Sequence, residues 1–289
     1  MNRWQIGAVK ITRIVELEVT GGSRFILPQA TRDAVKHMQW MKPHFMDDEG
    51  NLVMSVHALV VETAGRRIIV DTCIGNDKER AIPAWNKLQL PFLDDLKAAG
   101  YDRMDIDTVL CTHLHVDHVG WNTMLVDGKW IPTFPNARYL LDRAEFEYWD
   151  NEDTTADTTG NSNQDIMADS VRPVFDAGLI ELVDSNYRIC DELCLVPTPG
   201  HTPGHVSVYI ESEGQRALIT GDALHHPCQF ARPDWSSPAD YDQDASRKTR
   251  MAMIEDYGDD DILVIGTHFS TPTAGHIRSG DDGYWFDVS

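Results

Sequence analysis

The sequence predicts an α/β protein in which two β-sheets pack face to face and helices cover the outside. Short apolar runs typical of buried strands occur in both halves of the chain. Segments with helical character accompany the strands in each half, which favours a sandwich of sheets beneath helices. With 289 residues, 42% of them apolar, the chain can bury a substantial core, and we expect a single domain over 1–289.

The first half contains a predicted hairpin, a helix and a further strand. Residues 52–63 and 66–72 are largely apolar and are separated by Ala-Gly, a pattern typical of two antiparallel strands. A helix is predicted around 91–100, where a glycine marks its end. Residues 106–112 form a short apolar run and therefore predict a buried strand.

The second half repeats this pattern without a detectable sequence repeat. Strands are predicted at residues 192–198, 205–211, 216–222 and 262–268. Three of them, 192–198, 216–222 and 262–268, end at or close to a histidine or an aspartate, which supplies candidate functional groups at the strand ends.

Two segments are expected to lie outside this regular pattern. Residues 1–50 form an N-terminal extension, and residues 142–180 form a helical insert. The insert contains the polar stretch 151–165, which has almost no large apolar residues and is expected to be a surface loop. A role of this loop as a substrate lid is left open.

Composition and charge restrict the partners. The formal net charge of −21 disfavours nucleic acid, because binding to it depends on clustered Lys and Arg. No apolar run is long enough to span a membrane, and the first residues lack the pattern of a signal peptide. Five scattered cysteines indicate free thiols in a reducing compartment. We therefore expect a cytoplasmic protein with a small-molecule substrate.

The stretch C-T-H-L-H-V-D-H-V-G-W-N, residues 111–122, concentrates histidines directly after a predicted strand. His113 and His115 alternate in an extended segment and project to the same side, and Asp117 and His118 turn back towards them. Imidazole and carboxylate together suit zinc, manganese, iron or cobalt. Because a catalytic metal must keep one position open for water, these ligands are too many for one ion. Two metal ions are the natural inference.

Three further candidate ligands follow strands elsewhere in the chain. His201 lies in the turn T-P-G-H-T-P-G-H, Asp222 in T-G-D-A and His268 in G-T-H-F. Each residue alone could be an ordinary cap or loop residue. Together with the histidine cluster they indicate a two-metal site, in which Asp222 could bridge the two cations.

These motifs resemble the metallo-β-lactamase superfamily of αββα metallohydrolases over nearly the whole chain. The resemblance includes V-D-T at Asp71 and both histidines of P-G-H-T-P-G-H. It implies an αββα sandwich of two mixed sheets. It further implies one metal held by His113, His115 and His201, another held by Asp117, His118 and His268, and Asp222 bridging both. Asp71 and His205 would lie behind the ligands and pack against or orient them.

The resemblance also implies a chemistry. Two divalent cations, zinc first and manganese, iron or cobalt as alternatives, would share a hydroxide that attacks an electrophilic carbonyl or phosphoryl centre. Asp117 and Asp222 are the candidate catalytic residues, and Asp117 could orient the nucleophile and carry a proton to the leaving group. No serine or cysteine nucleophile is required.

Several branches of the superfamily fit less well. Dedicated β-lactamases with two zincs have cysteine or serine where this chain has Asp222, and RNA-processing members have a basic surface. Di-iron oxygen reductases carry glutamate where His115 stands, and glyoxalase II-type thioesterases end in a basic helical tail. The C-terminal segment 266–289, together with F-P-N-A-R at 134–138, looks most like the methyl parathion hydrolase and quorum-quenching lactonase group.

We therefore expect a hydrolase of a lactone or ester of a small, largely apolar substrate. The alternatives are a hydrolase of organophosphate triesters or activated aryl (dehalogenating) substrates, a glyoxalase II-like thioesterase, or an iron-dependent persulfide dioxygenase. A homodimer is expected from the resemblance alone. Five candidate substrate-binding residues lie near the predicted ligands, although core packing would explain the aromatic ones equally well: Trp121, His225, His226, Phe230 and Phe269.

Overall fold

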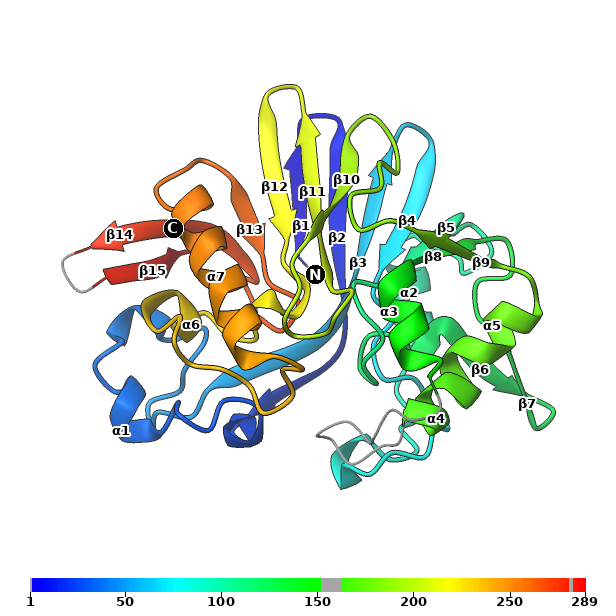
Figure 1. The fold of residues 1–289 in the computed structure, drawn as a ribbon, viewed down its shortest axis with the longest axis horizontal. Helices are drawn as coiled ribbons and strands as arrows, with labels where there is room; N and C mark the ends of the chain where they lie inside the picture. Colours follow the sequence, from blue (N-terminus) through cyan, green and yellow to red (C-terminus); the bar gives the residue numbers. More distant parts are fainter. Residues whose placement is uncertain (1, 152–162, 281–282) are drawn as a thin grey trace. The chain divides into compact units, whose positions relative to one another are not determined.

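The structure, a computed structural model, describes residues 2–151, 163–280 and 283–289 (Figure 1). Most of the polar stretch predicted as a loop at 151–165 lies outside the described residues. The described chain forms two compact units. Unit 1 contains residues 3–16 and the described part of 56–185, and unit 2 contains Asn2, 17–55 and the described part of 186–289.

The main sheet of unit 1 is mixed and has seven strands, in the order β1-β2-β3-β4-β5-β8-β9. The predicted hairpin at 52–72 is confirmed by antiparallel pairing of β3 with β4, whereas β4, β5, β8 and β9 pair in parallel. The strands are β1 (Arg3–Ile6), β2 (Val9–Thr20), β3 (Val53–Thr63), β4 (Arg66–Val70), β5 (Thr108–Leu110), β8 (Arg138–Asp142) and β9 (Ile180–Val183).

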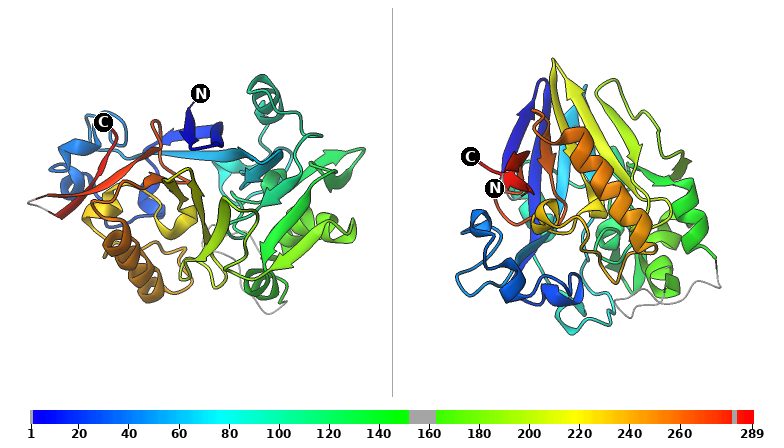
Figure 2. Two further views of the ribbon diagram at one scale, coloured as in Figure 1. Left: turned by 90° about the horizontal axis from the view of Figure 1, so that it is seen from above. Right: turned by 60° about the vertical axis from the view of Figure 1, so that its left-hand side comes forward.

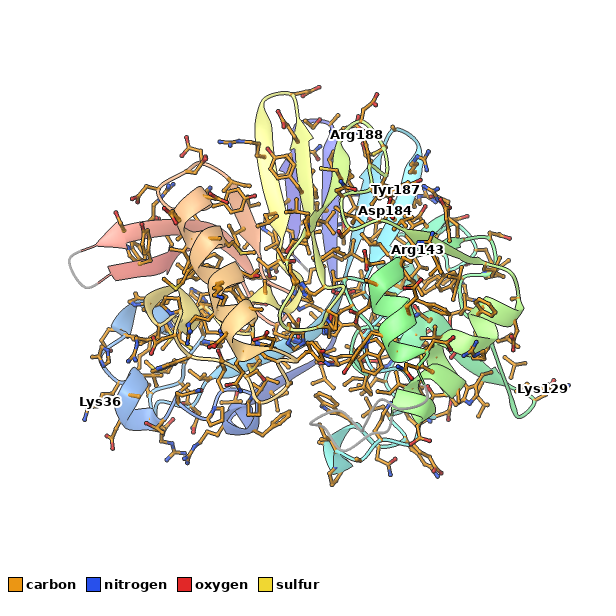
Figure 3. All side chains as sticks on the ribbon, viewed as in Figure 1. Lys36, Lys129, Arg143, Asp184, Tyr187 and Arg188 are labelled. Carbon is orange, nitrogen blue, oxygen red and sulfur yellow. The ribbon has the colours of Figure 1, made fainter. Side chains whose placement is uncertain are left out.

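Short helices and one hairpin complete unit 1. Strands β6 (Thr123–Val126) and β7 (Lys129–Pro132) form the hairpin, and Asp127 and Gly128 in its turn both have positive φ. Lys129 lies at its tip (Figure 3). The predicted helices are present as α2 (Phe92–Ala98), α3 (Arg143–Trp149), α4 (Asn163–Ile166), a π-helical turn (Met167–Val171) and α5 (Arg172–Asp176), with 3₁₀ turns at Pro83–Trp85 and Gly120–Asn122.

Unit 2 contains a six-stranded sheet, β10 to β15 in chain order. The four strands predicted in this half are confirmed, and β14 and β15 are added. The strands are β10 (Leu193–Pro197), β11 (Val206–Ser212), β12 (Gln215–Ile219), β13 (Leu263–Ile265), β14 (Ala274–Gly280) and β15 (Gly283–Asp287). The helices are α1 (Arg32–Val35), α6 (Cys228–Ala231) and α7 (Gln243–Tyr257), with 3₁₀ turns at Ser23–Phe25, Gln39–Met41 and Gly221–Ala223. None of the described helices has the length and apolar character needed to cross a lipid bilayer.

Helix α7 lies along one face of the six-stranded sheet (Figures 1 and 2). Its buried Met253 and Ile254 share an apolar core with Leu218 of β12 and Val264 of β13. This helix has no clear signal in the sequence, because most residues of Q-D-A-S-R-K-T-R-M-A-M-I-E-D-Y are polar. Asp242 caps this helix, since its side chain accepts hydrogen bonds from the backbone of Asp244 and Ala245.

Four phenylalanines form an aromatic cluster in the core of unit 2: Phe45, Phe230, Phe269 and Phe286. The ring of Phe286 lies 5.2 Å from the rings of Phe230 and Phe269, measured between centroids. We expect Phe286→Ala to lower the free energy of unfolding by about 3–5 kcal/mol, because it leaves a cavity among rigid rings. Denaturant unfolding measures this loss. Phe25→Ala is the control, since Phe25 is 47% exposed, and equal unfolding midpoints for the two variants would contradict the prediction.

Lys78 is buried in unit 1 within a polar cluster. Its Nζ donates to Thr123 Oγ1 at 2.8 Å and to the Asp169 carbonyl at 3.1 Å, and it lies 3.7 Å from the centroid of the Trp130 ring. The Asp169 carboxylate also accepts two hydrogen bonds from Arg80. Burial lowers the pKa of Lys78 from 10.5 to about 7, and Arg80 lowers it further while Asp169 and Asp77 raise it.

This shift predicts a pH dependence of stability. Between pH 7 and 10.5 the unfolded chain holds the Lys78 proton more tightly than the folded chain does, so stability rises with pH. The slope approaches about 1.4 kcal/mol per pH unit. Urea unfolding at several pH values in this window should give a shallower rise for Lys78→Met than for the unchanged protein. Lys87→Met, at an exposed lysine, should keep the original slope. Equal slopes for all three proteins would refute the assignment.

Candidate metal centre

The candidate ligands of unit 1 follow from its parallel strands. Strands β4, β5 and β8 are neighbours with Val70 paired to Leu110 and Leu110 paired to Leu140. The segments that leave these strands therefore begin at the same edge of the sheet. Asp71 follows β4 and the histidine cluster follows β5, while α3 follows β8.

Within the cluster, His113 and His115 point ring nitrogens at one another. His113 Nε2 lies 3.0 Å from His115 Nδ1. Two nitrogens on one tetrahedral zinc ion lie about 3.4 Å apart when each Zn–N distance is about 2.1 Å. The pair therefore suits a shared ion, and its metal-binding role stays a prediction. His113 is fully buried, and its Nδ1 donates to Thr112 Oγ1 at 3.1 Å.

Asp71 holds this arrangement from behind. Its Oδ2 accepts a hydrogen bond from His118 Nδ1 at 2.9 Å, and its Oδ1 accepts one from the Thr112 backbone at 2.8 Å. The Thr112 hydroxyl also donates to Asp71, which leaves its oxygen to accept from His113. His118 Nε2 lies on the opposite edge of its ring, 3.7 Å from Asp117 Oδ1. Asp71 thus makes the contacts that an orienting role requires.

The three candidate ligands of unit 2 are two histidines and the carboxylate that both of them contact. His201 follows β10, Asp222 follows β12 and His268 follows β13. Asp222 Oδ2 lies 3.1 Å from His268 Nε2 and 3.5 Å from His201 Nε2. All three residues are buried. A carboxylate oxygen and imidazole nitrogens in such close contact form a donor set that a divalent cation matches.

Both histidines of this group are fixed through their other ring nitrogen. His201 Nδ1 donates to Asp240 Oδ1 at 2.9 Å, and His268 Nδ1 donates to the Ser55 carbonyl at 2.9 Å. Asp240 itself lies 3.7 Å from the buried guanidinium of Arg250, and burial raises its pKa. Sequence reasoning missed Asp240, because a single aspartate in a loop carries no distinguishing spacing.

His205 is fixed on both sides of its ring. Its Nδ1 donates to the Thr198 carbonyl at 3.0 Å, so its Nε2 accepts from the Asp222 backbone N–H at 2.8 Å. With both nitrogens engaged, His205 is unsuited to bind a metal. It makes contacts that position the Asp222 backbone, as the predicted orienting role requires.

Four of the five predicted substrate-binding residues are buried and engaged within their own unit. Trp121 donates its indole N–H to Glu16 at 2.7 Å and stacks on Phe92. His226 Nε2 donates to the Phe45 carbonyl at 2.9 Å, and burial lowers the pKa of His226 to about 4. Phe230 and Phe269 belong to the aromatic cluster. A role for these four residues in substrate binding stays a prediction.

His225 differs from these four. It is fully buried, and neither of its ring nitrogens has a hydrogen-bond partner within the described part of the chain. Its Nε2 lies 3.5 Å from Asp222 Oδ2, and its ring contacts His201 edge-on. Burial lowers the pKa of His225 to about 3. A role for His225 in substrate binding also stays a prediction.

The fold and these donor groups define a class of protein, and comparison with known families agrees. Residues 52–256 match the family described as "Metallo-beta-lactamase superfamily". The chain therefore belongs to the metallo-β-lactamase superfamily.

Similar proteins include N-acyl homoserine lactonases. AttM of Rhizobium radiobacter is 32% identical over 136 residues, which are 46% of this chain and 47% of that protein. An N-acyl homoserine lactonase of Bacillus cereus is 27% identical over 193 residues, 61% of this chain and 67% of that protein. The match to AttM thus spans less than half of that relative's length.

Two solved structures resemble the whole chain. The hydrolase AbOPH has a TM-score of 0.81 and 24% identity, and the match covers 100% of this chain and 97% of that one. The dizinc quorum-quenching lactonase AidC, solved with the product N-hexanoyl-L-homoserine, has a TM-score of 0.80, 20% identity and the same coverage. At this identity the likeness concerns the fold, and it confirms the predicted fold class.

Proposed function

We propose that this protein is a dinuclear metal-dependent hydrolase that opens a lactone ring. One observation carries the metal assignment. Four predicted ligand histidines, His113, His118, His201 and His268, each have Nδ1 engaged by a protein oxygen, which directs Nε2 to a ligand. In the proposal both ligand sets serve one centre. His113, His115 and His201 would hold one ion, Asp117, His118 and His268 would hold the other, and Asp222 would be a ligand shared by both.

The donor atoms favour zinc, with manganese, iron and cobalt as alternatives. Imidazole nitrogens dominate and carboxylate oxygens complete the set, and no cysteine belongs to it. When bound, two such ions supply an acidic water and polarise a substrate carbonyl. The protein's own residues then determine where protons and substrate lie.

Three side chains have proposed roles in the reaction. Asp117 orients the nucleophilic water and carries a proton to the leaving alkoxide. Asp222 keeps its carboxylate fixed, because His205 holds its backbone N–H. His225 donates its ring N–H to the substrate oxygen, a role supported by ring nitrogens that have no hydrogen-bond partner among the described residues.

Screening of small-molecule substrates tests the proposed substrate class. Several similar proteins are named N-acyl homoserine lactonase, which supports a lactone with an apolar acyl chain as the first candidate. Aryl esters, thioesters and phosphotriesters remain comparison substrates. A persulfide dioxygenase is the alternative from another class.

The deciding experiment is elemental analysis of the protein purified without added metal. About two zinc or manganese ions per chain, followed by hydrolysis of acyl homoserine lactones in preference to the comparison substrates, would support the proposal. About one iron per chain, with oxygen uptake in the presence of a persulfide, would replace it by the dioxygenase. Two ions with faster hydrolysis of phosphotriesters would keep the metal centre and change the substrate.

A further inference from the structure

We propose that Glu145, on helix α3, is a positioning residue that sets the affinity of only one of the two metal ions. The inference rests on the proposed function, because it concerns the ion assigned to His113, His115 and His201. It adds a residue outside the ligand motifs and a selectivity that the ligand assignment alone does not contain.

The topology of unit 1 brings α3 to the ligand cluster. Strand β8 runs parallel to β5, so the helix that follows β8 starts beside the loop that follows β5. Arg143 begins α3 and is labelled in Figure 3. Asp142 caps the helix by accepting the Glu145 backbone N–H at 3.0 Å, which fixes where the Glu145 side chain begins.

One carboxylate oxygen of Glu145 accepts two hydrogen bonds from residues beside the ligand cluster. Its Oε1 accepts the Leu114 backbone N–H at 3.0 Å and the Trp149 indole N–H at 2.8 Å. Leu114 lies between the two ligands His113 and His115. Trp149, one helical turn after Glu145, contacts the His115 ring edge-on at 5.4 Å between centroids. Glu145 therefore fixes both the backbone between these histidines and the ring packed against one of them.

Burial makes these contacts consequential. Glu145 is only 1% exposed and Leu114 is fully buried, so a lost acceptor leaves a buried N–H unsatisfied. The cluster would have to shift to recover that hydrogen bond, and His113 and His115 would move with it. Metal ligands that lose such support typically lose about 10-fold to 100-fold in metal affinity.

The other ion has different support. His118 is held by Asp71, which leaves β4 rather than α3. The hydrogen bonds that Glu145 accepts from Leu114 and Trp149 lead instead to the part of the cluster that carries His113 and His115. A change at Glu145 should therefore lower the affinity for one ion and leave the affinity for the second unchanged, whereas a general loss of folding would lower both affinities.

The test measures zinc binding by competition with a chromophoric chelator. Glu145→Ala should lower the affinity for one of the two zinc ions by about 10-fold to 100-fold and change the affinity for the other by less than about threefold. Glu145→Gln retains an acceptor oxygen and should restore most of that affinity. Glu147→Ala is the matched control, because Glu147 is exposed on the same helix. Thermal unfolding of the metal-free proteins reports on folding.

Double variants identify the ion concerned. With His115→Ala, which removes a ligand of the same ion, the Glu145→Ala effect should largely disappear. With His268→Ala, which removes a ligand assigned to the other ion, the effect should persist. Equal weakening of both ions, or no change, would overturn the inference. If Glu145→Ala does not fold, Trp149→Phe tests the same selectivity with a smaller expected loss. Fewer than two zinc ions on the unchanged protein would instead overturn the proposed function.

Discussion

Asp222→Ala is expected to lower kcat/KM for the best lactone by at least about 10³-fold, equivalent to about 4 kcal/mol of transition-state stabilisation. Asp222 is the carboxylate at the centre of the unit 2 ligand group, and its Oδ2 lies within 3.5 Å of the Nε2 atoms of three histidines. In the proposed centre Asp222 is a ligand of both ions, so metal content should fall together with activity. Steady-state kinetics and elemental analysis of the same preparation measure the two effects.

Asp234→Ala provides the matched control for this prediction. Asp234 is an exposed aspartate of the same unit and pairs with Arg232 on the surface. This variant should keep both its metal and its activity within about twofold, since surface substitutions rarely change stability by more than about 0.5 kcal/mol. If Asp222→Ala retained two ions and hydrolysed the lactone at a similar rate, Asp222 would not bridge the ions.

Metal removal is expected to have the second large effect. Exhaustive chelation should abolish hydrolysis and lower the melting temperature, because ions that bind only the folded chain stabilise it by mass action. A free concentration 1,000 times the dissociation constant corresponds to about 4 kcal/mol for one ion. Differential scanning calorimetry before chelation, after chelation and after zinc addition measures the change. Activity should return in proportion to zinc, up to about two ions per chain.

The Asp222→Ala variant shows whether this stabilisation comes from the proposed centre. Its melting temperature should respond much less to added zinc than that of the unchanged protein. A metal-free protein that stays fully active would exclude metal-dependent hydrolysis. Equal zinc responses in the two proteins would assign the stabilisation to ions bound elsewhere.

The sequence predicted the candidate ligands because their spacing is local and chemically distinctive. His113, His115 and His118 occupy alternating and adjacent positions after one strand, and His201, Asp222 and His268 each follow another. Such patterns require little knowledge of tertiary structure. The hairpin at 52–72 was predictable for the same reason, since both of its strands are largely apolar and a two-residue turn separates them.

The residues behind the ligands were less accessible to sequence reasoning. Asp240 contacts His201, 39 positions away, and Glu145 contacts Leu114, 31 positions away. D-R-A-E at the start of α3 has the pattern of a helix-capping sequence, which explains Asp142 but gives no sign that Glu145 serves another loop. Helix α7 escaped prediction because its two core residues are outnumbered by polar ones.

The hydrogen bonds to Nδ1 of the candidate ligand histidines also bear on how the proposed centre would acquire its metal. Each of these four rings is held with its proton on the nitrogen that faces the protein, and the remaining nitrogen carries a lone pair. An arriving ion therefore meets preorganised donors, and the conformational entropy of ordering them has been lost during folding. Loading should be limited by removal of water from the ion, and exchange of one divalent metal for another should require little rearrangement of the chain.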